Sequence, residues 1–445
     1  MPKHNNLSLL SVIFVNINIM LGSGIFINTV LLPKLAGFLG FTSYIIVALL
    51  ILPLILCIAA LLEKYPFGGF YTYGKSNLNR FTGFFSSWIY FSTKLASAGL
   101  KIHVFSLLMQ NAVAWLRPFS TLFLDLVVVG FFTLLNTLNL KISNRVGYFF
   151  ILTKLTPIMF VFLGGLYLTG HAQFRPDMFL CAGIPATIPY VLYSYIGFEA
   201  SCSLSQTLKN PERDGPRAVL YSYIVVAVIS ALYQLLFYSS TGGDALLAQE
   251  NYMGAIPTFV KTLLPYYQVF ARKLISILHI AIAASALGGS YGIFFSNHWN
   301  LHTLANHKHI FFSHRLLKFN KHHIPALCVL VEGLIVFGYL LVTNGNQMIL
   351  QQLGALGPTT AYTLSVLGLA YAHYKGESFS IRRWVPWLGL ASCAILLGAC
   401  LRNLVLYGAG SLYLYLTMAL FGTSMYAITS LYRYYKYPVC KVEQK

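Results

Sequence analysis

The chain has 445 residues, of which 57% are apolar and only 9% are charged. Soluble domains carry roughly 25% charged residues, so most of this chain is expected to avoid water. Its net charge of +19 is spread along the chain rather than gathered on one solvated surface, which argues against nucleic-acid binding.

Apolar windows of about 20 residues predict twelve membrane-spanning helices in a lipid bilayer. They lie near residues 8–32, 41–62, 83–110, 119–140, 147–169, 184–206, 218–240, 270–300, 325–343, 348–373, 385–401 and 411–432. The first is too long for a cleaved signal peptide and lacks a small-residue cleavage site. The pattern predicts an all-α, multi-pass membrane protein.

Basic residues indicate how these spans are oriented. With both termini on the inner side, the inner segments hold 20 of the 30 Lys and Arg residues and the outer segments hold 7. Positive charge is retained on the cytoplasmic side during insertion. We therefore expect both termini in the cytoplasm, and a location in the plasma (cell inner) membrane.

Glycines interrupt the first and sixth spans, at residues 20–26 (MLGSGIF) and 193–199 (YSYIGFE). Non-helical backbone survives at membrane depth only where protein or a water-filled cavity supplies hydrogen-bond partners. Interruptions at matching positions of two halves are typical of the substrate site of a transporter. The spacing favours two five-helix repeats, 1–170 and 171–375, followed by two further helices and a tail, 376–445.

The longest segments between spans are 63–82, 241–269 and 301–324. We expect short helices in 241–269 that cap an outer vestibule.

Three motifs, in order, resemble those of the amino acid–polyamine–organocation superfamily of transporters. They are 22–26 (GSGIF), 65–73 (YPFGGFYTY), and 197–199 (GFE) followed by 209–213 (KNPER) and 216–218 (PRA). The resemblance implies a leucine-transporter-like 5+5 inverted repeat with broken helices 1 and 6. Asn18, where the family usually has glycine, and residues 297–301, which lack a common arginine, depart from the pattern.

A broken helix frees backbone N–H groups on one side and carbonyl groups on the other, which suit the two charges of an amino acid. The resemblance implies that Ser23 and Gly24 donate to the substrate carboxylate, and that the carbonyl groups of Met20, Tyr193 and Ile196 accept from its ammonium group. Gly22 belongs to the same break. The alternative is that the glycines only allow close helix packing. The Tyr193 ring is a candidate gate over the substrate, with core packing as the alternative.

Two intramembrane charges are candidates for coupling. Glu199 lies within a predicted span, and a carboxylate inside the membrane is costly and is expected to have a function. Burial favours the neutral form of the acid, so Glu199 is a candidate to take up a proton. A structural hydrogen bond is the alternative. Lys154 matches the lysine that sodium-independent relatives place where sodium-coupled ones bind the ion; a lysine whose ammonium group reaches the membrane surface is the alternative.

Other charges have less defined roles. Lys94 either meets a substrate carboxylate or pairs with an acid, and Glu332 is either that acid or part of a homodimer contact. Asp125 is expected at the membrane interface. His298 and His302 have a spacing that can hold a metal, but a solvated loop is the better interpretation. No metal site and no cofactor are expected.

No nucleotide-binding motif or nucleophile–base set is present, so the protein is predicted not to be an enzyme. The leading hypothesis is a sodium-independent secondary transporter of an amino acid, either a proton symporter or an exchanger. Alternatives are a polyamine or organic cation antiporter and, in a different class, an amino acid sensor that does not transport.

Overall fold

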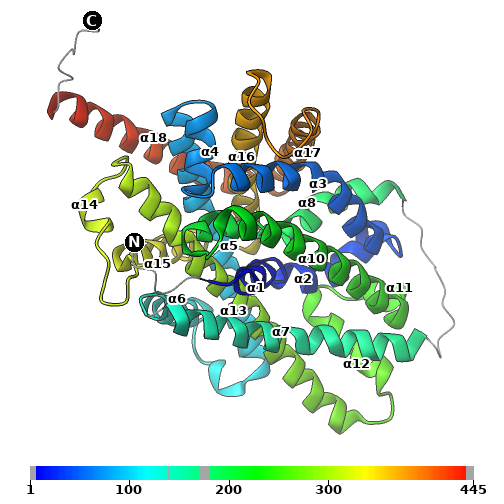
Figure 1. Cartoon of the computed structure of the whole chain (residues 1–445). Helices are drawn as coiled ribbons and strands as arrows, with labels where there is room; N and C mark the ends of the chain where they lie inside the picture. The colour runs from blue at the N-terminus through cyan, green and yellow to red at the C-terminus, as the bar shows by residue number, and fades with distance from the viewer. Residues whose placement is uncertain (1–6, 139, 170–180, 437–445) are drawn as a thin grey trace, which may run out of the picture.

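The computed structural model describes residues 7–138, 140–169 and 181–436. This part of the chain is almost entirely helical (Figure 1), and its one β-type contact is an isolated bridge between Leu7 and Leu208. The boundary expected between residues 170 and 171 and both chain ends lie outside the described residues.

Each predicted span corresponds to a helix or a broken pair of helices in the described part. The first is α1 (Leu9–Met20) with α2 (Ser23–Ala36), and the sixth is α8 (Ile184–Tyr195) with α9 (Ala200–Leu204). The others are α3 (Gly40–Lys64), α5 (Arg80–Ala112), α6 (Thr121–Asn136), α7 (Leu140–Thr169), α10 (Pro211–Thr241), α13 (Gln268–Asn306), α15 (Ala326–Thr343), α16 (Gln347–Tyr374), α17 (Val385–Tyr407) and α18 (Gly410–Lys436).

Among the described residues, eight helices are long and apolar enough to cross a membrane, and the α1–α2 pair adds a ninth. The remaining predicted spans have separate reasons for failing this criterion. Helix α6 has only 16 residues, α8 and α9 are short halves, and α5 carries Lys94 and Lys101 among many hydroxyl side chains. An all-α, multi-pass membrane fold is confirmed.

The centre of the bundle is formed by α5 and α13, which pack against each other, and α5 also packs against α16. Side chains of α5 are buried on nearly all of its faces between Gly83 and Val104, as expected of an interior helix. Helix α18 is the opposite case, because only 11% of its most apolar window is buried in protein. The charges of α5 therefore face protein, whereas most of α18 is not covered by the described part of the chain.

Short helices fill the long segments between spans. Residues 241–269 contain α11 (Gly243–Leu247), a 3₁₀ turn at Tyr252–Gly254 and α12 (Ala255–Leu263), which confirms the short helices expected there. Helices α4 (Gly69–Asn77) and α14 (Ser313–Leu316) lie in the other two segments.

His309, in the loop after α13, ties the end of α18 to the bundle. The Arg433 guanidinium donates to His309 Nδ1 (3.0 Å), so Nδ1 accepts, and Nε2–H donates to the Tyr71 hydroxyl oxygen (2.8 Å). Thr429 also donates to the His309 carbonyl oxygen (3.2 Å). Burial, followed by the charge of Arg433, lowers the pKa of His309 to about 3.

Acid is expected to loosen this contact. An unfolded histidine titrates near 6.5, so between about pH 6.5 and pH 3 the unfolded state binds the extra proton and folding stability rises with pH. The melting temperature of the wild type should therefore fall between pH 7.5 and pH 5 by more than that of His309→Gln. His314→Gln, at an exposed position of the same segment, is the control and should follow the wild type. Equal pH dependence in all three proteins would contradict this role.

Candidate functional site

The first span bends by 41° between α1 and α2. The chain leaves the helix at Leu21, whose N–H still donates to the Ile17 carbonyl oxygen, and Gly22 is the N-cap of α2. The carbonyl end of α1 thus lies directly beside the N–H end of α2, as the sequence predicted.

The second interruption separates α8 from α9. Ile196 is extended, and Gly197 has a φ of +144°, a conformation that side-chain-bearing residues rarely adopt. Glu199 is the N-cap of α9, and its carboxylate accepts a hydrogen bond from the Gly197 N–H (2.7 Å). Met20, Tyr193 and Ile196 are all buried where the sequence placed them, at the two breaks.

The two breaks contact each other. A Cβ atom added to Gly24 would lie 2.7 Å from Ser194 Oγ, and one added to Gly197 would lie 2.7 Å from Ile19 Cγ2 and 2.9 Å from Met20 Cγ. At such distances a side chain fits only if its neighbours shift, because the interior is closely packed. Glycine at these positions therefore permits the close approach of α2 to α8 and of the second break to the end of α1.

Polar side chains surround this contact. Ser23, at the start of α2, is 1% exposed, and its hydroxyl forms no well-aligned hydrogen bond to any described residue, although the Tyr193 hydroxyl is close. The Tyr193 hydroxyl hydrogen-bonds to Ser97 Oγ on α5 (3.1 Å). This contact holds the tyrosine against α5, and its role as a gate stays a prediction.

Lys154 of α7 lies beside the end of α1. Its ammonium group donates to the Asn18 carbonyl oxygen (2.6 Å) and to Asn18 Oδ1 (2.8 Å), while Asn18 Nδ2 donates to the Gly288 carbonyl oxygen on α13 (2.9 Å). Lys154 is 1% exposed, so the alternative in which its ammonium group reaches the membrane surface is wrong. The asparagine that departs from the family pattern is what binds this lysine.

Glu199 and Lys94 form a buried ion pair. Lys94 Nζ lies 2.6 Å from Glu199 Oε1, which also accepts from the Tyr90 hydroxyl (2.9 Å), and the two side chains are 2% and 0% exposed. Lys94 is therefore paired with an acid, as one alternative predicted. Its partner is Glu199 of the sixth span, and Glu332 is not the partner.

Glu332 instead lies on α15 near α13. Its carboxylate is buried and 3.9 Å from His298 Nδ1, which hydrogen-bonds to the Phe294 carbonyl oxygen (2.8 Å). The expectation of a solvated loop is wrong for His298, because it lies within α13 and is buried by the helices packed there. The described residues contain no group of His, Cys, Asp or Glu side chains that could hold a metal.

Asp125 is buried in protein. It is 0% exposed and hydrogen-bonds through Oδ2 to His103 Nδ1 of α5 (2.7 Å), and its place at the membrane interface stays a prediction.

Lys101 is a further basic residue within the third span, and no sequence motif assigns it a role. It follows Lys94 by two helical turns, and this spacing is the signal that places both lysines on one face of α5. Its ammonium group donates to the Ile19 carbonyl oxygen (2.9 Å), one residue beyond the carbonyl group bound by Lys154. Two lysines thus bind consecutive carbonyl groups at the end of α1, the end that carries partial negative charge.

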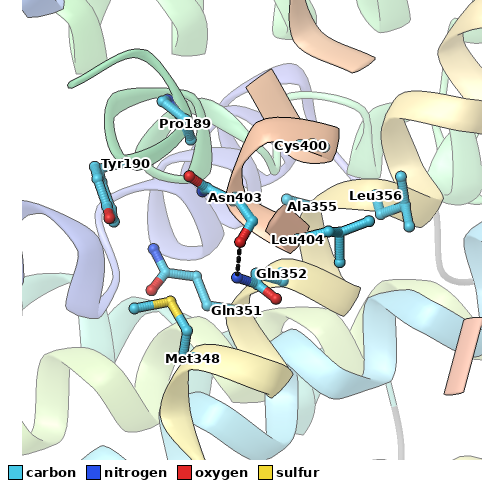
Figure 2. Close-up of a pocket in the computed structure, with 10 residues that line it drawn as sticks. All are labelled: Pro189, Tyr190, Met348, Gln351, Gln352, Ala355, Leu356, Cys400, Asn403 and Leu404. Carbon is cyan, nitrogen blue, oxygen red and sulfur yellow. Dashed lines mark hydrogen bonds between the residues drawn. The ribbon is translucent and has the colours of Figure 1, made fainter. Parts of the chain in front are cut away.

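A separate small pocket lies between α8, α16 and α17 (Figure 2). Its polar lining comes from Gln351, Gln352 and Asn403, and Gln352 Nε2 donates to the Asn403 carbonyl oxygen (3.2 Å). Pro189 and Tyr190 line its α8 side, less than two turns before the second break. None of the predicted substrate residues lines this pocket.

Comparison with known proteins extends the resemblance to amino acid transporters from three short motifs to most of the chain. The family described as "Amino acid permease" matches residues 7–430. An uncharacterized transporter of Legionella pneumophila is 28% identical over 279 residues, 57% of each chain. The uncharacterized amino acid permease YvbW of Bacillus subtilis is 25% identical over 383 residues, 77% of this chain and 79% of its own.

A third relative, the branched-chain amino acid permease BcaP of Bacillus subtilis, is 27% identical over 238 residues, 48% of this chain and 50% of its own. The chain thus spans only about half the length of the first and third of these relatives. These relatives are permeases and transporters, which are not enzymes. The family match covers nearly the whole chain, and we conclude that this protein belongs to the amino acid permease family of the amino acid–polyamine–organocation superfamily.

Proposed function

We propose that the protein is a secondary active transporter that moves an amino acid across the cytoplasmic membrane by alternating access. The observation that carries this proposal is the contact between the two broken helices, Gly24 against Ser194 and Gly197 against Ile19. It sets the N–H end of α2 and the carbonyl end of α1 beside the unwound residues of the sixth span. The two charges of an amino acid fit these two ends.

The proposed architecture is a 5+5 repeat, 1–170 and 171–375, with 376–445 added. Each repeat would begin with one of the two broken helices. The start of the first span and the end of the sixth lie on one side, because the Leu7 N–H donates to the Thr207 carbonyl oxygen (2.7 Å). With the distribution of basic residues, this supports a cytoplasmic N-terminus, and the even number of proposed spans returns the C-terminus to that side.

Sodium independence is part of the proposal. The Lys154 ammonium group is bound by two oxygen atoms of Asn18, an arrangement that supplies a positive charge without an ion. Energy would then come from a proton gradient or from exchange of solutes. A polyamine cargo is disfavoured, because Lys94, Lys101 and Lys154 are buried near the breaks and the carboxylate of Glu199 is occupied by Lys94.

Uptake of labelled amino acids into proteoliposomes tests the proposal. We expect uptake in sodium-free buffer that rises with an inward proton gradient or with amino acid loaded inside. Binding without uptake would instead indicate a sensor. Uptake that strictly requires sodium would contradict the role given to Lys154.

Substitutions at the first break test the proposed binding site. Ser23→Ala removes a hydroxyl without a well-aligned partner, so folding should be unchanged while affinity falls about tenfold, the effect of one hydrogen bond to a charged group. Gly24→Val should abolish binding, because its side chain both blocks the N–H groups and collides with Ser194. Calorimetry on the purified protein measures both.

The control is Gly130→Val in α6, where an added Cβ atom would meet nothing within 4 Å. This variant should bind like the wild type. Normal affinity in Gly24→Val would contradict the site assignment.

A further inference from the structure

Lys101 is buried where the two halves of the first span meet. Its side chain is 3% exposed, and its ammonium group donates to the Ile19 carbonyl oxygen (2.9 Å). Among the described residues no carboxylate lies within 4.0 Å of it. Two of its three N–H donors thus make no hydrogen bond to the described part of the chain.

The ammonium group also lies beside the start of α2. A Cβ atom added to Gly22, the N-cap of α2, would be 3.3 Å from Lys101 Nζ and 2.9 Å from its Cε. A helix N-terminus carries partial positive charge and free N–H groups, which favour an anion. Ser23, the first residue of α2, follows Gly22 directly, and its buried hydroxyl has no well-aligned partner. The ammonium group of Lys101 and the N-terminus of α2 thus lie together, and no carboxylate of the described residues is within 4.0 Å of that ammonium group.

The balance of buried charge indicates which anion. Lys94 is neutralised by Glu199, whereas Lys101 and Lys154 contact only oxygen atoms of uncharged groups in the described ranges. A zwitterionic amino acid brings no net charge to this site. An amino acid with a second carboxylate brings one negative charge, which offsets one of the two lysines in a medium where unpaired charge is costly.

We propose that the substrate is an acidic amino acid and that Lys101 is the residue that selects it. The proposal rests on the proposed transport function. The N–H groups of Ser23 and Gly24 bind the α-carboxylate, and Lys101 binds the side-chain carboxylate through its remaining donors. The α-ammonium group of the substrate is bound by the carbonyl oxygens of Met20, Tyr193 and Ile196, since Lys101 and Lys154 take those of Ile19 and Asn18.

Affinities for L-glutamate and L-glutamine, which are nearly isosteric and differ in charge, test the proposal on the purified wild-type protein. We expect glutamate to bind at least about tenfold more tightly. Lys101→Met keeps the length of the side chain and removes the charge, so the ratio should fall to near one. Lys34→Met is the control, because this exposed lysine also donates to a backbone carbonyl oxygen, that of Glu250, away from both breaks, and it should keep the wild-type ratio.

Equal affinity for the two ligands in the wild type, or an unchanged ratio in Lys101→Met, would overturn the assignment. The wild-type comparison needs no variant, so it decides the matter even if Lys101→Met does not fold. Transport of neutral amino acids without preference for acidic ones would leave the proposed function standing and refute this inference. Failure to bind or transport any amino acid would refute the proposed function itself.

Discussion

Glu199→Gln is expected to destabilise the protein by about 3–5 kcal/mol, the effect of breaking a buried ion pair from one side. With a neutral amide at position 199, the Lys94 side chain, which is only 2% exposed, loses the carboxylate that pairs with its charge. It also weakens the contacts with Tyr90 and with the Gly197 N–H, which together hold the second break against α5. Thermal unfolding in detergent, followed by fluorescence, should show a large drop in melting temperature.

Two variants make this measurement specific. Lys94→Met combined with Glu199→Gln removes both charges and should recover much of the lost stability, since no unpaired charge is left. Lys64→Met breaks the exposed pair with Glu377, whose side chains are 32% and 42% exposed, and should cost less than about 1 kcal/mol. A melting temperature of Glu199→Gln close to that of Lys64→Met would contradict a structural role for the buried pair.

The helical framework could be predicted from the sequence because each span depends on local composition. The interruption at Gly22 and the one at Gly197 could be predicted for the same reason, since each is a short run within an apolar helix. The structure adds that the two glycine-containing segments touch, which no local pattern states.

Partners of the intramembrane charges could not be predicted in the same way. Lys94 and Glu199 are 105 positions apart, and their contact depends on the rotation of α5 relative to the broken sixth span. Glu332 was an equally reasonable acid by depth alone, but it lies on α15, beside His298. His298 was placed wrongly as well, because it lies at the end of the apolar segment and the helices packed around α13 bury it.

This pairing changes what is expected of Glu199. As a lone buried acid it was the first candidate to take up a proton. With three donors around its carboxylate, from Lys94, Tyr90 and the Gly197 N–H, it has the geometry of a structural clamp between α5 and the sixth span. Lys154 has no acidic partner among the described residues, and it binds the end of α1 directly. A proton-dependent step is therefore better sought at Lys154.

Lys154→Ala is accordingly expected to lose uptake far more than binding. The substitution leaves the Asn18 carbonyl group without its donor and unties α7 from α1, while Ser23 and Gly24 keep their groups for the substrate. Alternating access requires these helices to move in concert, so the cycle should fail although the substrate still binds. Calorimetry measures the binding, and proteoliposomes in sodium-free buffer measure the uptake.

The pH profile of uptake then separates the two coupling candidates. If Lys154 carries the proton-dependent step, residual uptake by Lys154→Ala should be flat with pH, while Glu199→Gln, assayed below its lowered melting temperature, should keep the wild-type profile. A group that must gain or lose a proton sets the pH at which transport changes, and removing that group removes the change. The opposite pattern is a flat profile in Glu199→Gln and a wild-type profile in Lys154→Ala. It would assign the proton-dependent step to Glu199, and Lys154 would then be a fixed charge at the end of α1.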